Sequence, residues 1–339
     1  MYMKAWIYEK YGPSEVLELR DIPMPVPVDD QVLVRVEAVS INDWDWQLLL
    51  GIPFANRMMN GFFRPRKKVL GSDIAGRIEA VGPGVDRFEP GDEVYGDLSG
   101  MWGGFAEYVC PRQDALEKKP SGMSFEEASA VPQAAMLAVQ GLRDAGQLQP
   151  GEKLLINGAG GGVGTFGIQL ARLYEGVDVT GVDSGPKLDM LRRLGFDHVI
   201  DYTRTDFTKT GQQYDLILDT KTNRPVSHYL RVLLPGGRYV TVGGSVPRLL
   251  AVFLSGALRP KPDREKLYVA ALKANRDLLF MNELYEAGLI KPVIDGPCLF
   301  DELPRAMHRF GEGIHKGKLV LTAGRSFPEK NPQPERRKQ

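Results

Sequence analysis

The first part of the chain carries short runs in which apolar and polar residues alternate. The stretch VLVRVEAV, from Val32 to Val39, alternates in this way, and similar runs surround Ile74–Ala80 and Phe105–Val109. A period of two is typical of strands that bury one face. Glycine and proline punctuate these runs densely, so we predict an irregular, mostly-β domain with few helices over residues 1–123.

The pattern changes after residue 123. A helix-like stretch runs from Ser124 to Asp144, and the apolar runs LLIN, VDVTGV, DHVI, YDLILD and RYVTVGG then alternate with helical segments, the last over Asn275–Ala287. Such near-continuous apolar runs are typical of parallel strands covered on both faces. We therefore predict an α/β fold whose doubly wound domain spans residues 124–288.

The end of the chain returns to the first pattern. Short β-like runs and one helix around Leu303–Phe310 follow residue 289, so we assign residues 289–325 back to the first domain. The tail over 326–339 is rich in proline and charge and poor in apolar residues, which predicts disorder.

Composition indicates an ordinary two-domain enzyme of 339 residues. Lys plus Arg balance Asp plus Glu at 43 each, which argues against a nucleic-acid or anionic-membrane surface acting through bulk electrostatics. The N-terminus lacks the order of a signal peptide, and no apolar run is long enough to cross a bilayer. We expect a cytoplasmic protein with a small-molecule partner and no nucleic-acid or membrane contact.

The strongest local signal is a glycine-dense turn between an apolar strand and a helix. In LLINGAGGGVGTFGIQLARLY the pattern Ala159-x-Gly161-x-x-Gly164 has alanine in place of the first glycine of the dinucleotide fingerprint. Glycine lets the backbone approach a pyrophosphate closely, and the helix N-terminus offers free N–H groups and positive partial charge. We predict that the cofactor contacts Ala159, Gly160, Gly161, Gly162 and Val163.

The choice between NAD and NADP is signalled in two directions. Asp183 ends the next predicted strand at roughly the 20-residue spacing at which an acidic residue meets the adenosine ribose, which favours NAD. Ser184, Lys187 and Tyr202 are placed to donate hydrogen bonds to a 2′-phosphate, which favours NADP. Asp183 has a second interpretation as the N-cap of the helix that follows it.

Several collinear motifs resemble the zinc-independent, quinone oxidoreductase-like branch of the medium-chain dehydrogenases/reductases. They are VLGSDIAGRIEAVGPGVDRFEPGDEVYG, GGFAEYV, VPQAAMLAVQGLRDAGQLQPGEKLLINGAGGGVG, LGFDHVIDY, LLPGGRYVTVGG, and EAGLIKPVIDG followed by HKGKLVL. The resemblance covers nearly the whole chain. It implies a GroES-like catalytic domain built from both chain ends, a Rossmann cofactor domain between them, and a site in the cleft.

The resemblance also implies roles for single residues. Gly162 and Val163 should lie by the diphosphate, Gly243 and Gly244 near the nicotinamide, and Ser184, Lys187 and Tyr202 by the adenosine ribose. In NADPH-using relatives the counterparts of the last two hold the 2′-phosphate, so NADP(H) is slightly favoured over NAD(H). Family members commonly dimerise through the edge of the cofactor sheet, which implies a homodimer.

Zinc-dependent relatives place a cysteine where this chain has Ser40 to Asn42, and a His-Glu pair where it has Ser72 and Asp73. The four histidines show no metal-ligand spacing, so we expect no metal. Without a Lewis acid a conjugated acceptor is the easier substrate, because its reduction leaves an enolate that hydrogen bonds stabilise. The stretch SINDWDWQLLLG resembles the family's active-site segment. Asn42 is the candidate hydrogen-bond donor to the substrate, or else an amide that caps the loop. Asp45 is the weaker candidate, or else a residue that braces the loop.

The predicted function is NAD(P)H-dependent hydride transfer to a small hydrophobic conjugated carbonyl or quinone. Two alternatives stay open because fold and cofactor site do not fix the substrate. One is an enoyl-thioester or aldehyde/ketone reductase on the same scaffold. The other is a non-enzymatic NAD(P)H-binding partner protein.

Overall fold

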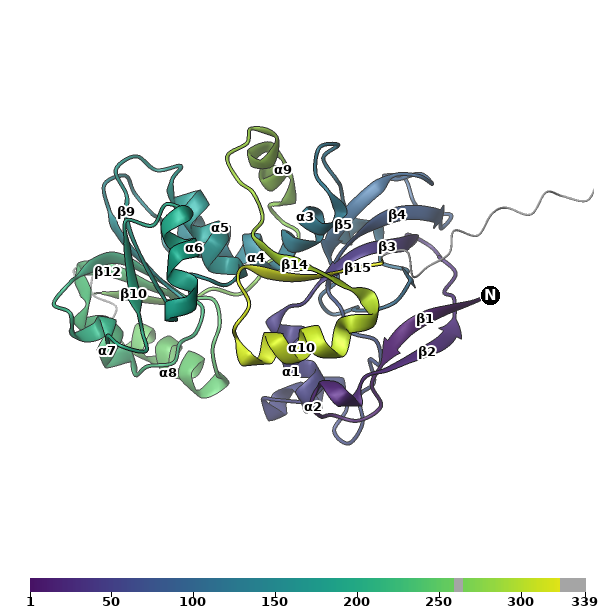
Figure 1. Ribbon diagram of the computed structural model, residues 1–339, viewed down its shortest axis with the longest axis horizontal. Coiled ribbons are helices and arrows are strands. Elements are labelled where there is room, and N and C mark those ends of the chain that lie inside the picture. Colours follow the sequence, from purple (N-terminus) through teal and green to yellow (C-terminus); the bar gives the residue numbers. More distant parts are fainter. Residues whose placement is uncertain (259–264, 324–339) are drawn as a thin grey trace, which may run out of the picture.

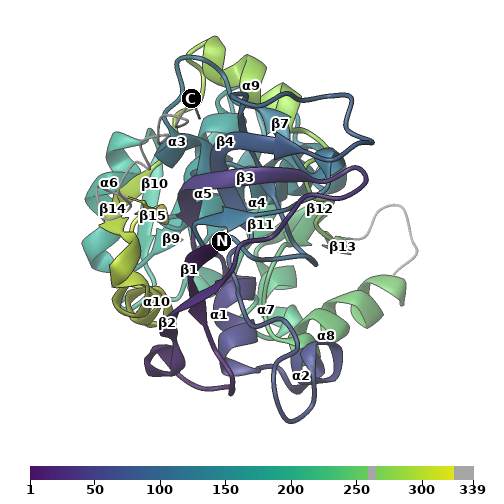
Figure 2. The same cartoon turned by 90° about the vertical axis from the view of Figure 1, so that its right-hand side faces the viewer.

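The computed structural model describes residues 1–258 and 265–323. Two lobes lie side by side in Figure 1, one built on a parallel sheet and the other mostly of β-structure. The strands at the end of the chain lie beside strands from its beginning, as Figures 1 and 2 both show.

The mostly-β lobe holds a seven-stranded sheet and a separate hairpin. Its path runs β14-β15-β3-β4-β5-β7, with β6 paired to β3. The last two strands of the chain therefore complete a sheet that its first third begins. The strands are β1 (Tyr2–Ile7), β2 (Glu18–Pro23), β3 (Val32–Ser40), β4 (Asp73–Val81), β5 (Glu93–Asp97), β6 (Tyr108–Val109), β7 (Glu117–Lys118), β14 (Ile294–Leu299) and β15 (Lys318–Thr322).

The other lobe holds a six-stranded parallel sheet in the order β10-β9-β8-β11-β12-β13. The order reverses between β8 and β11, and ligands of doubly wound sheets bind at such a switch point. This sheet confirms the predicted fold class. Its strands are β8 (Lys153–Asn157), β9 (Asp178–Asp183), β10 (His198–Asp201), β11 (Tyr214–Asp219), β12 (Leu233–Thr241) and β13 (Lys266–Val269).

Helices cover the parallel sheet and border the space between the lobes (Figures 1 and 2). No helix in the described part of the chain is long and apolar enough to cross a membrane. The helices are α1 (Asp43–Leu50), α2 (Phe54–Asn60), α3 (Phe125–Ala130), α4 (Pro132–Val139), α5 (Gly162–Ala171), α6 (Leu188–Arg193), α7 (Val226–Arg231), α8 (Val246–Ala257), α9 (Leu278–Glu286) and α10 (Leu303–Glu312).

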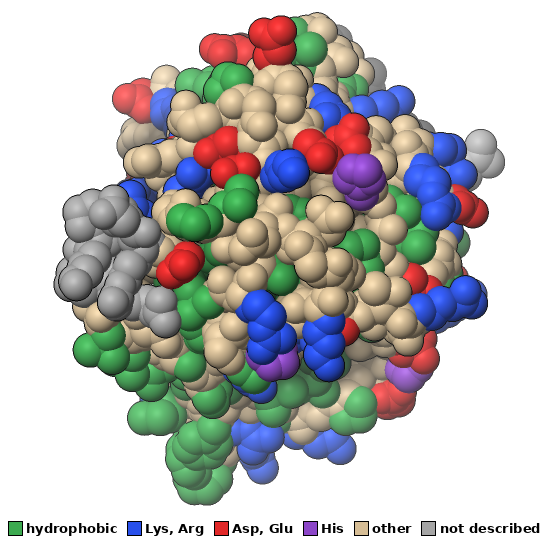
Figure 3. All heavy atoms as spheres, turned by 90° about the vertical axis from the view of Figure 1, so that its left-hand side faces the viewer, with side chains coloured by type: hydrophobic (Ala, Val, Ile, Leu, Met, Phe, Trp, Pro, Cys, Tyr) green, Lys and Arg blue, Asp and Glu red, His purple; other side chains and the backbone are tan. Residues whose placement is uncertain are grey.

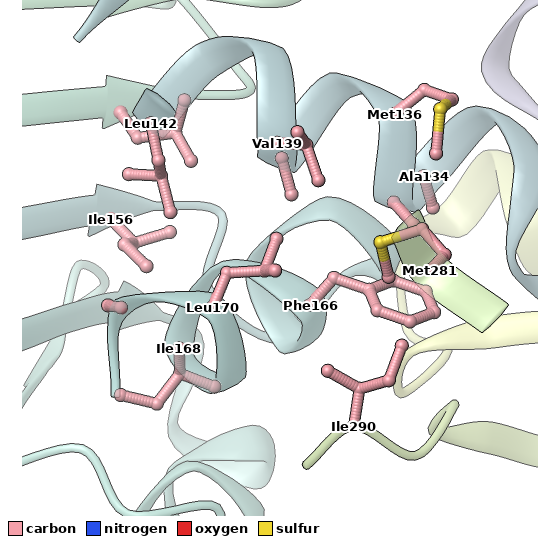
Figure 4. Close-up of a cluster of buried hydrophobic side chains, with 14 of the residues drawn as sticks. Ala134, Met136, Val139, Leu142, Ile156, Phe166, Ile168, Leu170, Met281 and Ile290 are labelled. Carbon is pink, nitrogen blue, oxygen red and sulfur yellow. The ribbon is translucent and has the colours of Figure 1, made fainter. Parts of the chain in front are cut away.

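The main core packs α4, α5 and α9 against the parallel sheet. Figure 4 shows Phe166 of α5 beside Met281 of α9 and Ile290. Helix α5 approaches the end of β8 closely at Gly164, because a Cβ there would lie 2.4 Å from the backbone oxygen of Ala159. This packing fixes the start of α5 against the end of β8.

Two predicted helices have different bounds. The stretch from Ser124 to Asp144 breaks into α3, α4 and a π-helical turn, because Pro132 has no N–H with which to continue α3. Ser124 caps α3, its Oγ accepting from the backbone N–H of Glu127 at 3.1 Å. The helix predicted from Asn275 begins only at Leu278, since Asn275 is left-handed and its side chain pairs with the backbone of Asp97.

Other elements were missed or are shorter than predicted. The strand predicted over Phe105–Val109 reduces to β6, and the edge strand β13 was not predicted. Helices α1 and α2 lie in the lobe for which we expected few helices, where short segments show no clear periodicity. The exact domain boundaries stay predictions, and the tail over 326–339 lies outside the described residues.

Candidate functional site

The glycine turn links β8 to α5 and leaves the start of that helix open. Gly161 is the N-cap, and no side chain caps the helix. The first N–H groups of a helix have no partner within it, so those of Gly162 and Val163 are available to a ligand. A Cβ on Gly161 would meet only the oxygen of Gly158, at 3.6 Å, which leaves open space in front of the turn. These residues fit a diphosphate.

A cavity of about 350 Å³ lies where the turn meets the mostly-β lobe. It brings together several of the predicted site residues. From the cofactor domain come Gly161, Gly162, Val163, Gly243 and Gly244, and from the other lobe comes Asn42. Its further walls include Ile41, Trp46, Gln47, Gln133, Leu137, Lys221, Val242, Phe310, His315 and Lys318.

The residues predicted for the adenosine end form a separate cluster at the ends of β9 and β10. Asp183 accepts from the backbone N–H groups of Gly160 and Ser184, each at 2.8 Å. The Lys187 ammonium lies 3.5 Å from the same carboxylate, and the Tyr202 N–H donates to the Asp183 carbonyl at 3.1 Å. None of these residues, nor Ala159, lines the cavity.

This geometry changes how the NAD and NADP signals are understood. Lys187 is buried against Asp183, and burial lowers the pKa of its ammonium. The two residues that pointed to different cofactors therefore neutralise each other. Asp183 does not act as an N-cap, because its carboxylate holds the glycine turn and α6 begins only at Leu188.

Asn42 lines the cavity with its amide oriented by neighbours. Its Nδ2 donates to Ser72 Oγ at 3.0 Å, and its Oδ1 accepts from the Lys318 ammonium. Asp45 is fully buried behind it and accepts from the N–H groups of Asn42 and Gly71, both at 3.0 Å. Burial raises the pKa of Asp45 to about 7. The structure thus places Asp45 as the brace of Asn42, outside the cavity wall.

Lys318 is the site residue that the sequence analysis missed. It begins β15, and its buried Nζ approaches Asn42 Oδ1, the Ile41 carbonyl at 3.3 Å and Asp73 Oδ2 at 3.5 Å. Its stem lies against the glycine turn, since a Cβ on Gly162 would be 2.7 Å from Lys318 Cδ. The signal that could have found it is a lysine at the head of the apolar run KLVLT.

Buried carboxyl groups surround this ammonium. Asp73 and Asp97 face each other across β4 and β5, and each has one buried oxygen without a hydrogen-bond partner among the described residues. Burial raises the pKa of Asp73 to about 7, outweighing the attraction of Lys318, and also raises that of Asp97. With Asp45 this makes three buried carboxyls near one ammonium, and burial opposes the charged form of each.

His315 is a second cavity residue without a predicted role. Its ring stacks on Phe310 with 4.8 Å between centroids. Burial, together with Lys187, Lys221, Lys318 and Arg309, lowers the pKa of the imidazole to about 3, so the ring is neutral at physiological pH. Its buried Nδ1 has no hydrogen-bond partner in the part of the chain that the structure describes.

The positions at which relatives hold zinc do not suit a dication here. The described residues contain no group of three or more His, Cys, Asp or Glu side chains arranged for a metal. Asn42 instead donates to Ser72, and the Lys318 ammonium, which contacts Asn42 and Asp73, carries a charge that would repel a cation.

Comparisons with known proteins point to one family. Residues 28–121 match the alcohol dehydrogenase GroES-like domain, and residues 194–321 match a domain described as zinc-binding dehydrogenase. The chain is 34% identical over 331 residues to 2-methylene-furan-3-one reductase of Solanum lycopersicum, covering 94% of this chain and 79% of the relative. It is 31% identical over 335 residues to the chloroplastic NADPH-dependent alkenal/one oxidoreductase of Arabidopsis thaliana, with the same coverage.

Solved structures agree. The quinone oxidoreductase from Coxiella burnetii superposes with a TM-score of 0.84 at 27% identity, covering 95% of this chain and 99% of its own. The CurK enoyl reductase superposes with a TM-score of 0.80 at 25% identity, covering 94% and 99%.

Proposed function

Because this chain belongs to the medium-chain dehydrogenase/reductase family, we propose that it uses NAD(P)H to reduce a conjugated carbonyl compound or a quinone. The observation that carries the proposal is the cavity between the glycine turn and Asn42. It joins a glycine turn that fits a dinucleotide to a space lined by both apolar and polar side chains. Two relatives named for alkenal/one and furanone reduction support this substrate class.

The chain's own residues would bind and orient the substrate. Trp46, Leu137, Val242 and Phe310 give the cavity apolar walls, which suit a hydrophobic conjugated molecule and exclude water from it. Gly243 and Gly244 leave space beside these walls where a nicotinamide ring would lie. NAD(P)H bound there would supply the hydride.

The developing charge needs donors near the substrate oxygen. When a hydride adds to the β-carbon of an enone, the electron pair of the double bond moves toward the carbonyl and leaves an enolate. Asn42 lines the cavity and gives one of its two amide hydrogens to Ser72, and the neutral His315 ring holds one N–H. We assign these two groups to the enolate oxygen, and water supplies the proton that completes reduction at the α-carbon.

Lys318 and Asp45 would act through Asn42. The ammonium fixes the amide oxygen and the carboxyl fixes the backbone, so the amide group keeps one orientation. Both are positioning residues. The scheme includes no zinc step, because the Lys318 ammonium lies 3.5 Å from Asp73 and its charge would repel a dication there.

We further propose NADPH as the preferred cofactor. Lys187 neutralises the Asp183 charge that would otherwise repel a 2′-phosphate, and Tyr202 is exposed beside it. A relative that is named NADPH-dependent supports this choice.

The experiment is NADPH oxidation with a panel of substrates followed by product analysis. We expect turnover of medium-chain 2-alkenals, 2-alkenones or a naphthoquinone, with saturated carbonyls or hydroquinones as products. Asn42→Ala should lower kcat by about 100- to 1,000-fold, as for loss of one oxyanion donor, with little change in NADPH affinity. Allylic alcohols as products would instead favour a carbonyl reductase. NADPH binding without turnover of any member would favour a binding protein.

A further inference from the structure

A segment between β3 and β4 exposes an unusual number of large apolar side chains. Residues 52–68 comprise α2 and the turn after it. Phe62 packs edge-on against both Phe54 and Phe63, with ring centroids 5.2 and 4.8 Å away. Residues 1–258 and 265–323 leave this aromatic cluster about half exposed or more, and Phe63 is 85% exposed. Ile52, Met58 and Met59 are exposed beside it.

Helix α8 exposes a second apolar face. Val252 is its one buried residue, through which it packs on the lobe. The opposite side carries Leu250, Phe253 and Leu254 in the open, followed by Leu258, which is 80% exposed. An amphipathic helix normally turns a polar face to water, and α8 turns an apolar one.

The two segments lie at the same end of the molecule. Figures 1 and 2, which are turned about a vertical axis, both place α2 and α8 at the bottom. Figure 3 shows hydrophobic side chains gathered at the lower left of the view, where α8 lies. Each segment also follows the cavity wall along the chain, since Gly244 lies just before α8 and Gln47 shortly before α2.

The charge of this face differs from that of the whole chain. Neither residues 52–68 nor α8 contains an aspartate or glutamate, while the first segment holds Arg57, Arg64, Arg66, Lys67 and Lys68 and the second holds Arg248. Glu9 pairs with Lys68 from a neighbouring segment. Apolar side chains rimmed by a run of cations are the combination that binds the surface of an anionic bilayer.

We propose that residues 52–68 and α8 form a docking surface for an anionic lipid bilayer. The Phe, Met and Leu side chains enter the interfacial layer, and the Arg64–Lys68 run contacts the headgroups. The contact is interfacial, in keeping with helices too short to span. This proposal goes beyond the proposed reaction and does not depend on it. It departs from our expectation of no membrane contact, which rested on the balanced charge of the whole chain.

A second copy of the chain is the competing occupant. A symmetric dimer through this face would place the cationic runs of both copies at one interface, and neither segment holds an aspartate or glutamate to pair with them. An anionic bilayer supplies the opposite charge that both segments lack, which decides our choice.

The test is flotation of the full-length protein with vesicles. One set is phosphatidylcholine alone, and the other contains about one-third phosphatidylserine. We expect the partition coefficient to be at least about tenfold higher for the anionic vesicles, and to fall in high salt because the basic run is screened.

Three double variants locate the surface. Phe62→Ser with Phe63→Ser and Leu250→Ser with Phe253→Ser should each lower anionic-vesicle binding by about tenfold or more, because each removes two inserting side chains. Lys67→Gln with Arg64→Gln should remove most of the preference for anionic lipid. Leu289→Ser with Leu299→Ser is the matched control, since both leucines are about half exposed elsewhere and should leave binding unchanged.

Sedimentation equilibrium separates the two occupants, and near-UV circular dichroism verifies that each variant is folded. No binding of wild-type protein to anionic vesicles overturns the proposal. So does wild-type binding by folded variants of both apolar segments. Conversion of a dimer to monomers by the Phe62 and Phe63 changes, without vesicle binding by the wild type, would assign this face to a second copy.

Discussion

The glycine turn and the Lys318 cluster meet in one cavity but are built in different ways. The turn is a contiguous stretch whose work is done by backbone N–H groups and by the absence of side chains. The cluster joins Asn42 and Lys318, which are 276 positions apart, and its work is done by buried charge. The contrast teaches that one wall of this site follows from local chain geometry, whereas the other exists only after the whole fold has formed.

The difference has an energetic side. A ligand can replace the water at an open helix start with little cost to the fold. A buried ammonium has no such freedom, because removing one partner leaves the other charge unpaired in a low dielectric. Changes at the turn should therefore affect binding, and changes at the cluster should affect stability as well.

The largest effect should come from Lys318→Met. The change keeps the stem that packs on Gly162 but removes the charge that Asp73 and Asn42 face. We expect the free energy of unfolding in urea to fall by about 3–5 kcal/mol, as when a buried pair loses one member. Adding Asp73→Asn should recover part of the loss. Lys316→Met is the control. Equal free energies of unfolding for the Lys318 variant and the wild type would show that the Lys318 charge does not stabilise the fold.

Gly161→Val should separate binding from folding. The site has room for a Cβ in the folded chain, and the φ of −89° is accessible to valine. The side chain would stand where the pyrophosphate must approach, so we expect NADPH affinity to fall by about 100-fold or more, worth at least about 2.7 kcal/mol, with unfolding nearly unchanged. Gly164→Val should instead destabilise the fold. Tight NADPH binding by the Gly161 variant would remove this turn from the site.

The Asp183–Lys187 pair gives a smaller effect. Lys187→Ala should weaken NADPH by about 1–3 kcal/mol, since a charge-assisted bond is lost and Asp183 is left to repel the 2′-phosphate, while NADH binding changes little. Asp183→Ser would relieve repulsion but also releases the Gly160 N–H, so the gain for NADPH should be modest. Titration of both cofactors into both variants measures this. Wild-type protein that binds NADH tenfold more tightly than NADPH would contradict the preference.

The smallest effect is a slope with pH. Burial raises the pKa of Asp73 from 3.8 to about 7, so between these values the folded chain holds a proton that the unfolded chain has released. This share of stability is complete at acidic pH and is lost as pH rises toward about 7. In the Asp73→Asn variant the free energy of unfolding should fall less steeply with pH across this window. Its slope should differ from that of the wild type by less than about 1.4 kcal/mol per pH unit. Unfolding curves at several pH values test it, and parallel profiles would argue against the shift.

The parts of the fold that the sequence predicted share one property. Near-continuous apolar runs predicted the parallel strands, and the glycine spacing predicted the turn between β8 and α5, because each signal lies within a short window. That this turn binds a phosphate stays a prediction. Helix α2 escaped notice because it is short and its apolar residues face outward. The break at Pro132 was readable from the sequence, but the apolar pattern on both sides concealed it.

The candidate site was predictable to a lesser degree. Asn42 was singled out through family resemblance, but the direction of its amide depends on Lys318, and no local pattern links these residues. The ion pair between Lys187 and Asp183 could not be predicted either, although both residues were named. The sequence places them near the end of the same strand, but it does not show whether their charged groups meet. His315 was missed because the lowering of its pKa depends on burial and on cations that only the fold brings near its ring.

The strand order of the mostly-β lobe determines when its sheet can be completed during synthesis of the chain. β3 is made early, but its partner β15 comes at the very end of the described chain. Until then the Ala38–Ser40 end of that edge of β3 has no partner strand, and an open edge is a place where chains pair wrongly. Because Lys318 is the first residue of β15, its ammonium arrives with the strand that closes that edge. A chain truncated before residue 318 would therefore lack both the closing strand and the Lys318 side of the cavity.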